Sequence, residues 1–488
     1  MNFHLFSLEI LAILCYNIFV EVCAKAGHRQ ASTRRDERNL KMLFKNITIL
    51  DENFEIKENM YVGTEGSRIT YIGTEMPQDA AEDKEGAAEA ERVNTAADFG
   101  EAYDGRGKLL MPAFYNSHGH SPMALMRGYG ENMVLQDWLN KLIFPFEDKL
   151  DSNAVYWGTT LSMAESMRFG IVSTTDMYYF IDDMVRATDD AGMKANISRA
   201  IVNFDDSDVW QLPSMQEMKR TFEAYHNMND EKIKMDVSIH GEYTSNHLAV
   251  EAVAAFGREH GANMHIHISE TRSEHEECKA RHGGMTPVQY FNSLGAWDMP
   301  ATAAHCVWIE GEDFDILKEK SVTVATNPVS NLKLASGVCN VPKLLDMGIN
   351  IAIGTDSVAS NNSLNFFEEM KVMALAAKEK FSDPTAVTPQ QVLRAATVNG
   401  ARGQGRSDCG LLKEGSRADL IVVDLNQPNM HPIHNLTNNL VYSASGSDVV
   451  LTMADGKVLY EKGEYKTIDI EKTIFEAARA TEKILKQL

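Results

Sequence analysis

The sequence predicts an α/β protein whose main body is a (β/α)8 TIM barrel and whose two chain ends together form a small β-sandwich. Between residues 111 and 403, short apolar strand runs alternate with helical patterns, which is typical of parallel βαβ units. Eight such runs over about 290 residues suit this barrel. They end near His118, Asp176, Val202, His240, Ser269, His305, Thr326 and Asp356.

One βα unit, at residues 151–176, shows the local pattern. Asp151, Ser152 or Asn153 can cap a helix, and apolar residues then recur at helical spacing. Gly170 can end that helix before residues 171–176 resume as an apolar strand. A strand that follows each helix in this way predicts a parallel sheet covered by helices.

The two chain ends are expected to pair with each other. Residues 42–50 alternate as a first strand, and Gly456 marks a hairpin turn near the C-terminus. An acidic, Ala-rich stretch at 78–91 predicts a surface insertion. The expected organisation is an N-terminal extension (1–41), the first part of the β-sandwich (42–110), the barrel (111–403), and the second part of the β-sandwich with a C-terminal helix (404–488).

The N-terminal extension allows two interpretations. Residues 10–20 are uncharged and largely apolar, and residues 24–26 resemble a small-residue cleavage site, as in a signal peptide. However, no Lys or Arg precedes that run, Glu9 and Glu21 flank it, and it is too short to span a bilayer. We expect a cytoplasmic protein in which residues 1–41 are not part of the fold, with a secreted protein as the alternative.

Composition narrows the classes of partner. A net charge of −22 disfavours binding to a phosphate backbone, so we expect no nucleic-acid partner. No membrane partner is expected either, and a homo-oligomer is left open. Six cysteines without close metal-type pairs suggest reduced thiols. A small-molecule substrate is the expected partner.

Polar side chains gather where the predicted strands end, which is where barrel enzymes build their active sites. His118 and His120 are two residues apart, so a strand presents both on one face, where they can reach one metal ion. The fifth run presents His265 and His267 in the same way, and spacing alone does not choose between them. Further candidates at strand ends are Glu270, His305 and Asp356.

Each of these residues also has a purely structural interpretation. His305 could be a satisfied core histidine, Asp356 a helix cap and Glu270 a solvated loop residue. If all of these interpretations were correct, four strand ends of one barrel would carry such residues by chance. The probability of that is below about one in ten. The joint pattern therefore predicts a metal site.

Several segments together resemble the amidohydrolase superfamily, within the branch of 5′-methylthioadenosine and S-adenosylhomocysteine deaminases and chlorohydrolase-like relatives. The resemblance runs from about Met42 to the C-terminal region. Its segments are His-Gly-His with the residues that follow (118–128), His-Ile-Ser-Glu (267–270), Ala-His-Cys-Val (304–307), Asn-Pro-Val-Ser-Asn-Leu-Lys-Leu-Ala-Ser-Gly (327–337), and Gly-Thr-Asp (354–356) followed by residues 359–362.

The resemblance implies that His118, His120, His267 and Asp356 bind one divalent metal ion, zinc or iron, with His265 in a second layer. It also implies catalytic roles for three residues. Asp356 would accept a proton from the attacking water, His305 would orient that water, and Glu270 would act as the general acid. Related binuclear hydrolases carry a carboxylated lysine at the end of the fourth strand, where this chain has His240. The resemblance therefore implies a single metal.

The resemblance further assigns Glu147 to the ribose hydroxyls, His240 to the purine, and Arg199 to the amino-acid carboxylate of S-adenosylhomocysteine. A helix-cap role remains open for Glu147. The chain departs from the branch in the acidic segment 205–211, at Thr326 and at Ser357, and in Ile-His-Gly-Glu-Tyr at 239–243. The acidic segment puts S-adenosylhomocysteine in doubt.

The expected function is hydrolytic deamination of an adenosine-like nucleoside to the inosine analogue and ammonia. The candidate substrates are 5′-methylthioadenosine, 5′-deoxyadenosine, adenosine and S-adenosylhomocysteine. The alternative is a deaminase or chlorohydrolase that acts on guanine, a pterin or an s-triazine. A non-catalytic barrel that serves as a scaffold is the third hypothesis, and the complete set of candidate ligands argues against it.

Overall fold

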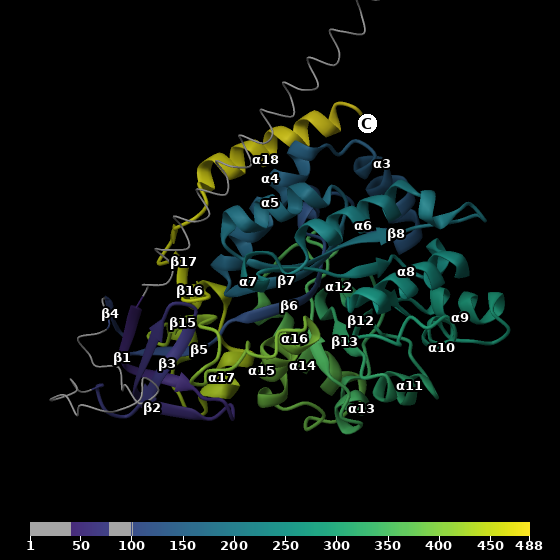
Figure 1. The fold of residues 1–488 in the computed structure, drawn as a ribbon. Helices are drawn as coiled ribbons and strands as arrows, with labels where there is room; N and C mark the ends of the chain where they lie inside the picture. Colours follow the sequence, from purple (N-terminus) through teal and green to yellow (C-terminus); the bar gives the residue numbers. More distant parts are fainter. Residues whose placement is uncertain (1–40, 78–98, 100) are drawn as a thin grey trace, which may run out of the picture.

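A computed structural model of the chain describes residues 41–77, 99 and 101–488. The expectations for the N-terminal extension and for the acidic stretch 78–91 lie outside these residues. Figure 1 shows a barrel-like body, coloured blue to green, beside a smaller sheet that contains both the purple and the yellow parts of the chain. In the described part of the chain, no helix is long and apolar enough to cross a membrane.

The barrel sheet is parallel and follows the chain order, so its strands lie side by side from β14 back to β6. Within the described residues it has nine strands, because the fourth barrel strand is divided into β9 and β10, which both pair with β8. The strands are β6 (Phe114–Gly119), β7 (Ile171–Tyr178), β8 (Lys194–Ile201), β9 (Ile233–Met235), β10 (Val237–Ile239), β11 (Met264–Ile268), β12 (Ala301–His305), β13 (Thr323–Thr326) and β14 (Ile351–Ile353).

The last barrel strand returns to the first. A parallel β-bridge joins Gly119 to Asp356, and the backbone N–H of Asp356 donates to the carbonyl oxygen of His118 over 3.0 Å. The sheet is therefore a nearly closed barrel, and the eight predicted runs are its strands. The structure confirms the predicted (β/α)8 fold class.

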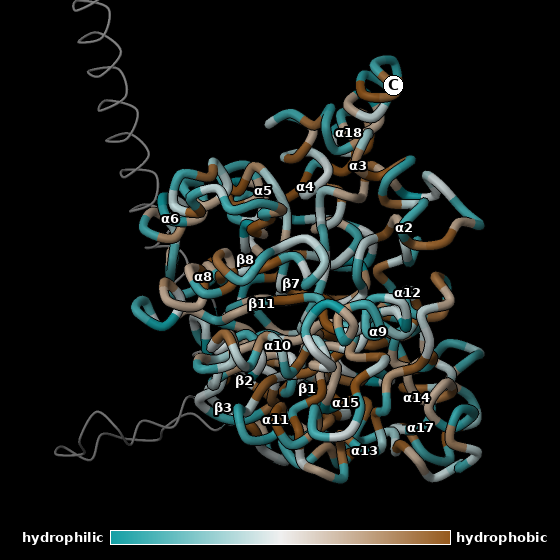
Figure 2. The backbone as a smooth tube through the Cα atoms, turned by 90° about the vertical axis from the view of Figure 1, so that its right-hand side faces the viewer, coloured by the Kyte–Doolittle hydropathy of each residue, from teal (hydrophilic) through white to brown (hydrophobic). Residues whose placement is uncertain are grey.

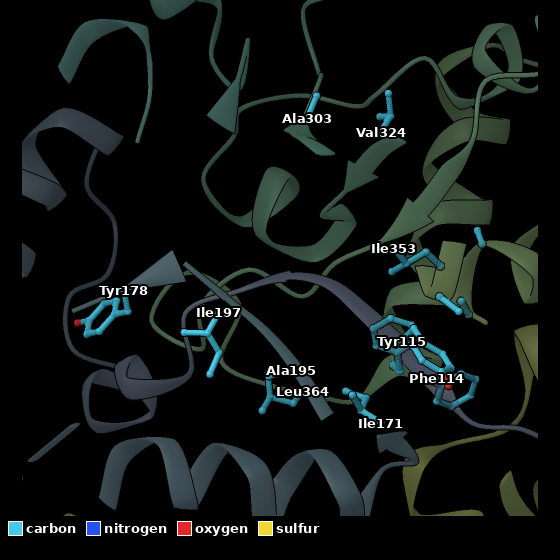
Figure 3. Packing of buried hydrophobic residues seen from close by; sticks show 14 of the residues in the cluster. Phe114, Tyr115, Ile171, Tyr178, Ala195, Ile197, Ala303, Val324, Ile353 and Leu364 are labelled. Carbon is cyan, nitrogen blue, oxygen red and sulfur yellow. The ribbon is translucent and has the colours of Figure 1, made fainter. Parts of the chain in front are cut away.

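The barrel strands are buried on both faces, which explains why they appear in the sequence as continuous apolar runs. Figure 3 shows Phe114, Ile171, Ile197, Val324 and Ile353, which come from five different strands, within one packed core. In Figure 2, brown segments lie inside the molecule beside the β11 label, whereas the outer helix α9 is largely teal. The hydrophobic core thus holds the strand ends in a fixed arrangement.

Helices cover the outside of the barrel, and α4 also contacts the terminal sheet. Helices of six or seven residues follow β12 and β13, whereas a helix of 15 residues follows β14. Among the described residues, the α-helices with more than four residues are α4 (Ser152–Arg168), α5 (Ile181–Ala191), α6 (Pro213–Tyr225), α8 (His247–His260), α9 (Arg272–Arg281), α10 (Pro287–Ser293), α11 (Asp313–Glu319), α12 (Pro328–Lys333), α13 (Val341–Asp346), α14 (Phe366–Lys380), α15 (Pro389–Ala396), α16 (Val398–Gly403), α17 (Leu436–Tyr442) and α18 (Ile470–Leu485).

Helix α4 forms as its sequence predicts. The side chain of Asp151 accepts the backbone N–H of Ala154 at 2.8 Å, which satisfies one of the free donors of the first turn. Gly170 has a φ of 88°, a conformation that favours glycine, and β7 begins at the next residue. The yellow helix α18 lies along α4 in Figure 1.

The two chain ends pair with each other and form one continuous sheet. Strand β5 from the N-terminal part pairs antiparallel with β15 from the C-terminal part, with Met111 opposite Ile421. Gly456 lies in the turn between β16 and β17, where its φ is 74°. The strands of this sheet are β1 (Lys41–Leu50), β2 (Ile56–Glu65), β3 (Arg68–Gly73), β4 (Glu101–Asp104), β5 (Lys108–Pro112), β15 (Leu420–Asp424), β16 (Val449–Ala454), β17 (Lys457–Glu461) and β18 (Glu464–Tyr465).

A buried charge cluster joins the sheet to the barrel. Lys194, at the start of β8, contacts the carboxylate of Asp419 and lies 2.8 Å from that of Asp455. The hydroxyl of Tyr115 donates to Asp419 as well. Because these groups are nearly inaccessible to solvent, each charge depends on the others for compensation.

Candidate active site

The C-terminal ends of the first and eighth strands approach each other very closely. A Cβ atom at Gly354 would lie 2.7 Å from the Cβ atom of His118 and 2.9 Å from its backbone nitrogen, closer than side-chain carbons can pack. Only glycine therefore fits at this position. The close approach brings Asp356 beside His118 and His120, although the sequence separates the aspartate from the histidines by more than two hundred residues.

The predicted metal ligands gather at this point. Asp356 Oδ1 lies 3.5 Å from His118 Nε2 and 3.3 Å from His120 Nε2. The Nε2 atoms of His120 and His267 are 3.4 Å apart. Two overlapping groups have their possible ligand atoms within 4.8 Å of one another: His118, His120 and His267 form one, and His118, His305 and Asp356 form the other.

Three strand ends at the site adopt the left-handed backbone region. The φ values are 48° for Ser269, 72° for His305 and 59° for Asp356. Residues other than glycine rarely adopt this conformation, which costs on the order of 1–3 kcal/mol each and persists where the surrounding structure enforces it. The strain lies where β11, β12 and β14 lead into the loops of the site.

Each imidazole of the cluster is oriented through its Nδ1 atom. His120 Nδ1 is 2.7 Å from the carbonyl oxygen of Met177, and His267 Nδ1 is 2.6 Å from that of His240. His118 Nδ1 lies 2.9 Å from Nε2 of His265, which places His265 behind His118 and not in the cluster. The Nε2 atoms of the other three histidines are therefore left for the common centre.

Asp356 is held by two hydroxyls. Ser330 and Ser360 donate to its Oδ2 atom at 2.6 and 2.9 Å, while Oδ1 faces the histidines. Burial opposes ionisation of Asp356, but the contacts with His118 and His120 outweigh it and hold the pKa of this carboxyl well below its usual range. Asp356 is thus a charged carboxylate at neutral pH.

The donor set fits a divalent metal ion. His118 Nε2 is buried and has no hydrogen-bond partner among the described residues. Burial lowers the pKa of His118 to about 3 and that of His267 well below its usual value, so both rings are neutral and can donate a lone pair. Three imidazole nitrogens and one carboxylate oxygen are ligands that zinc and other divalent transition ions accept.

Glu270 and His305 lie on the side of the cluster that opens to a cavity. Glu270 Oε2 is 3.9 Å from His305 Nε2, and Ser336 donates to its other oxygen at 3.3 Å. Burial raises the pKa of Glu270, an effect that favours a carboxyl group which can carry a proton. His305 is oriented by Asn331, whose Oδ1 atom lies 2.8 Å from His305 Nδ1.

A cavity of about 700 Å³, including its open mouth, lies over this cluster. Its floor contains the predicted site residues His120, His267, Glu270, His305 and Asp356. Glu147 and His240, which the resemblance assigns to substrate binding, line the same cavity. The walls are largely aromatic or aliphatic and include Trp138, Ile143, Tyr178, Tyr179 and Tyr243.

Glu147 lies at the end of the short helix α3 (Phe144–Glu147). The hydroxyl of Tyr179 donates to its Oε2 atom at 3.4 Å. Burial raises the pKa of Glu147 to about 7, although Tyr178 and Tyr179 favour its charged form. Its carboxylate can accept hydrogen bonds from a polar group bound in the cavity.

Arg199 does not line this central cavity. It lies at the end of β8 in an adjoining outer cavity, which shares Phe144, Glu147 and Tyr179 with the central one. The sequence indicated the position of Arg199 near the site but not its surroundings, which include an ion pair to Glu217 over 3.0 Å.

Several residues of the site were not found from the sequence. Ser330 and Asn331 lie in a segment that carries the family resemblance, and that motif was the available signal. Trp138 and Ile143 belong to an irregular stretch with a short α-helix, a π-helical turn (Leu139–Ile143) and α3, which has no regular period to recognise. Their role as cavity walls depends on how this stretch folds over the barrel.

Histidines and carboxylates gathered round one cavity at the C-terminal strand ends define the class of (β/α)8-barrel hydrolases. The comparisons with known proteins identify the family within this class. The amidohydrolase family model matches residues 109–459. The chain belongs to this family and is a hydrolytic enzyme.

Known relatives cover almost the whole chain. It is 36% identical over 451 residues to the 5-methylthioadenosine/S-adenosylhomocysteine deaminase of Thermoanaerobacter pseudethanolicus, covering 92% of this chain and 100% of that protein. It is 38% identical over 393 residues to the 5'-deoxyadenosine deaminase of Methanothermobacter thermautotrophicus, covering 80% and 91%. Among solved structures, an adenosine deaminase from Xanthomonas campestris with bound zinc has a TM-score of 0.82 at 27% identity, covering 92% of this chain and 99% of that one.

Proposed function

We propose that this protein is a metal-dependent deaminase that converts an adenosine-like nucleoside to the inosine analogue and ammonia. The observation that carries the proposal is that one cavity contains the metal-type cluster and Glu270 together with Glu147, which also lines the adjoining outer cavity. These groups match the two ends of a purine nucleoside, namely its reacting amino-bearing ring and its ribose. The names of the relatives support this choice of substrate class.

His118, His120, His267 and Asp356 are the proposed ligands of a single ion, and zinc is the ion we expect. When bound, such an ion lowers the pKa of a water molecule towards neutrality and so supplies hydroxide at pH 7. The second layer keeps the ligands in place, because Met177, His240 and His265 contact the Nδ1 atoms of the ligand rings.

Proton transfer is proposed to involve three residues. Asp356 accepts the proton of the attacking water through Oδ1, because Ser330 and Ser360 occupy Oδ2. His305 orients that water through Nε2. Glu270 protonates the ring nitrogen next to the amino-bearing carbon, then takes up the proton of the newly attached hydroxyl group and passes it to the departing ammonia, and burial favours the protonated form of Glu270. The proton held by Asp356 then restores the acid form of Glu270.

Substrate orientation is proposed to depend on Glu147 and His240. The carboxylate of Glu147 accepts hydrogen bonds from the two ribose hydroxyls. His240 contacts the purine, and its ring is fixed by a contact of Nδ1 with the hydroxyl of Thr244 at 3.2 Å. The aromatic walls exclude water from the reacting ring, which strengthens the electrostatic interactions there.

The test is ammonia release by the purified, metal-analysed protein with 5′-methylthioadenosine, 5′-deoxyadenosine, adenosine, guanine, a pterin and an s-triazine. We expect turnover of the nucleosides. Glu270→Gln should lower kcat by about 10²–10⁴-fold without loss of metal. Glu276→Gln, on the exposed face of the following helix α9, is the matched control and should leave kcat unchanged.

Glu147→Gln separates the two substrate classes. If the substrate is a nucleoside, this variant raises KM for the nucleoside, whereas a substrate without ribose is unaffected by it. Absence of deamination of every nucleoside by protein that contains metal would refute the proposal, and turnover of guanine, a pterin or an s-triazine alone would assign the enzyme to another activity of the branch.

A further inference from the structure

The outer cavity is lined by apolar and charged side chains. It encloses about 910 Å³, including its open mouth, and it adjoins the central cavity along Phe144, Glu147 and Tyr179. Phe180 and Leu150 add further apolar surface. If Glu147 holds the ribose, as proposed above, a substituent on the 5′ carbon has this outer cavity as its neighbouring space.

The single basic residue that lines the outer cavity in the described part of the chain is already engaged. Arg199 Nε lies 3.0 Å from Glu217 Oε2, and its Nη1 donates to the carbonyl oxygen of Ala200 at 2.8 Å. Its guanidinium also lies over the ring of Tyr179, with 4.6 Å from Cζ to the ring centroid. These three contacts hold the positive charge against the wall.

Glu217, like Arg199, is held in place by hydrogen bonds. Its Oε1 atom accepts the backbone N–H of Ile181, the first residue of helix α5, at 3.2 Å, while Oε2 binds the arginine. The carboxylate therefore has no need to move away when a ligand enters. A ligand carboxylate would meet an arginine whose charge is neutralised by a fixed neighbour.

The remaining charges of the outer cavity are acidic. Glu147, Asp148 and Glu217 line it together with Arg199, so acidic groups outnumber the basic one. A ligand anion in this cavity would lose hydration and meet a negative field.

We propose that the outer cavity is the subsite for the 5′-substituent and that the Arg199–Glu217 pair makes it select against an anionic group there. This inference rests on the proposed nucleoside deaminase function. The class of substrate that fits is an adenosine whose 5′-substituent is uncharged or cationic. A methyl or methylthio group would pack against Phe144, Tyr179 and Phe180, and an ammonium group would find acidic neighbours.

Three substrates separate charge from size. They are 5′-methylthioadenosine, S-adenosylhomocysteine, and decarboxylated S-adenosylhomocysteine, in which only the carboxylate of the amino-acid group is replaced by hydrogen. We expect kcat/KM for S-adenosylhomocysteine to be at least about tenfold below that for the decarboxylated compound. A buried carboxylate that lacks a charge-assisted partner would produce a loss of this size. Dissociation constants measured with the Glu270→Gln variant should show the same order without turnover.

Glu217→Gln tests the cause of the selection. Glutamine keeps an oxygen for the N–H of Ile181 but no longer neutralises Arg199, so S-adenosylhomocysteine should improve about tenfold relative to 5′-methylthioadenosine. Adding Arg199→Gln should abolish that gain. Glu223→Gln removes the same charge from an exposed position on the same helix, α6, and should leave the ratio unchanged.

The outcomes distinguish this inference from the proposed function. If no nucleoside is deaminated, the proposed function fails. If 5′-methylthioadenosine is deaminated but S-adenosylhomocysteine matches or exceeds its decarboxylated analogue, the inference alone is overturned. This comparison uses the unaltered protein, so it holds even where a variant fails to fold. An equal loss with both longer substrates would show that size, and not charge, limits the subsite, which also overturns the inference.

Discussion

Asn331 fixes the imidazole of His305 through a contact of 2.8 Å between Asn331 Oδ1 and His305 Nδ1. The amide oxygen accepts the Nδ1 proton, so the Nε2 atom that faces Glu270 is left as the free nitrogen. Both side chains are buried, and the amide nitrogen of Asn331 has no hydrogen-bond partner among the described residues. The orientation of Asn331 therefore depends on His305.

Replacing Asn331 should impair the turnover step. We expect Asn331→Ala to lower kcat by about 10–100-fold with little change in KM, because residues that orient catalytic groups have effects of this size. Asn331→Asp keeps an acceptor for Nδ1 and should retain more activity than the alanine variant. Steady-state kinetics and metal content of both variants provide the measurement, and equal loss in both would contradict the positioning role.

Removal of the metal should affect both activity and stability. An ion that binds only the folded state stabilises it by about 4 kcal/mol when its free concentration is a thousand times its Kd. Chelation should therefore abolish deamination and lower the Tm, and added zinc should restore both. His267→Ala should be unable to retain the metal, whereas His247→Ala, exposed on α8, should match the unaltered protein. A Tm that is insensitive to chelation would argue against a metal held by these residues.

Binding of the nucleoside should weaken as pH falls through about 7. Burial raises the pKa of Glu147 to about 7, so its carboxylate becomes protonated below that value and can no longer accept two hydroxyl groups. We expect KM to rise towards low pH, at most about tenfold per pH unit. In Glu147→Gln, KM should be high at every pH and should lack this dependence, and a profile identical to that of the unaltered protein would assign the titration to another group.

The contact between barrel and terminal sheet should depend on Lys194. Lys194→Met leaves the buried carboxylate of Asp419 without its cation and leaves Asp455 with Arg417 alone, and breaking a buried ion pair on one side costs about 3–5 kcal/mol. Denaturant unfolding should show this loss in the free energy of unfolding. Lys371→Met, at an exposed position on α14, is the control and should change it little. A change as small as that of the control would show that the cluster contributes little.

Much of the barrel could be predicted because its signal is local. Each strand is a short apolar run, and capping residues such as Asp151 and glycines such as Gly170 mark the ends of the helices between them. The same holds for the metal-type cluster, because strand geometry places His118 and His120 on one face without knowledge of the fold. The family resemblance added His267, since spacing alone did not separate it from His265.

The fold was needed wherever partners come from distant strands or irregular segments. Asn331 meets His305, and Glu217 neutralises Arg199, across side-chain contacts that no local pattern records. The walls of the cavity come from an aperiodic stretch around Trp138, for which the sequence offers no repeat.

By itself, the sequence determined the alternation of strands and helices and the types of residue at the strand ends. These depend on periodicity and spacing, which act between near neighbours in the chain. Only the tertiary structure decided which side chains orient the proposed catalytic groups and which charge the outer cavity presents. Those properties arise from distances between residues far apart in the chain, such as Lys194 and Asp419, and packing alone sets these distances.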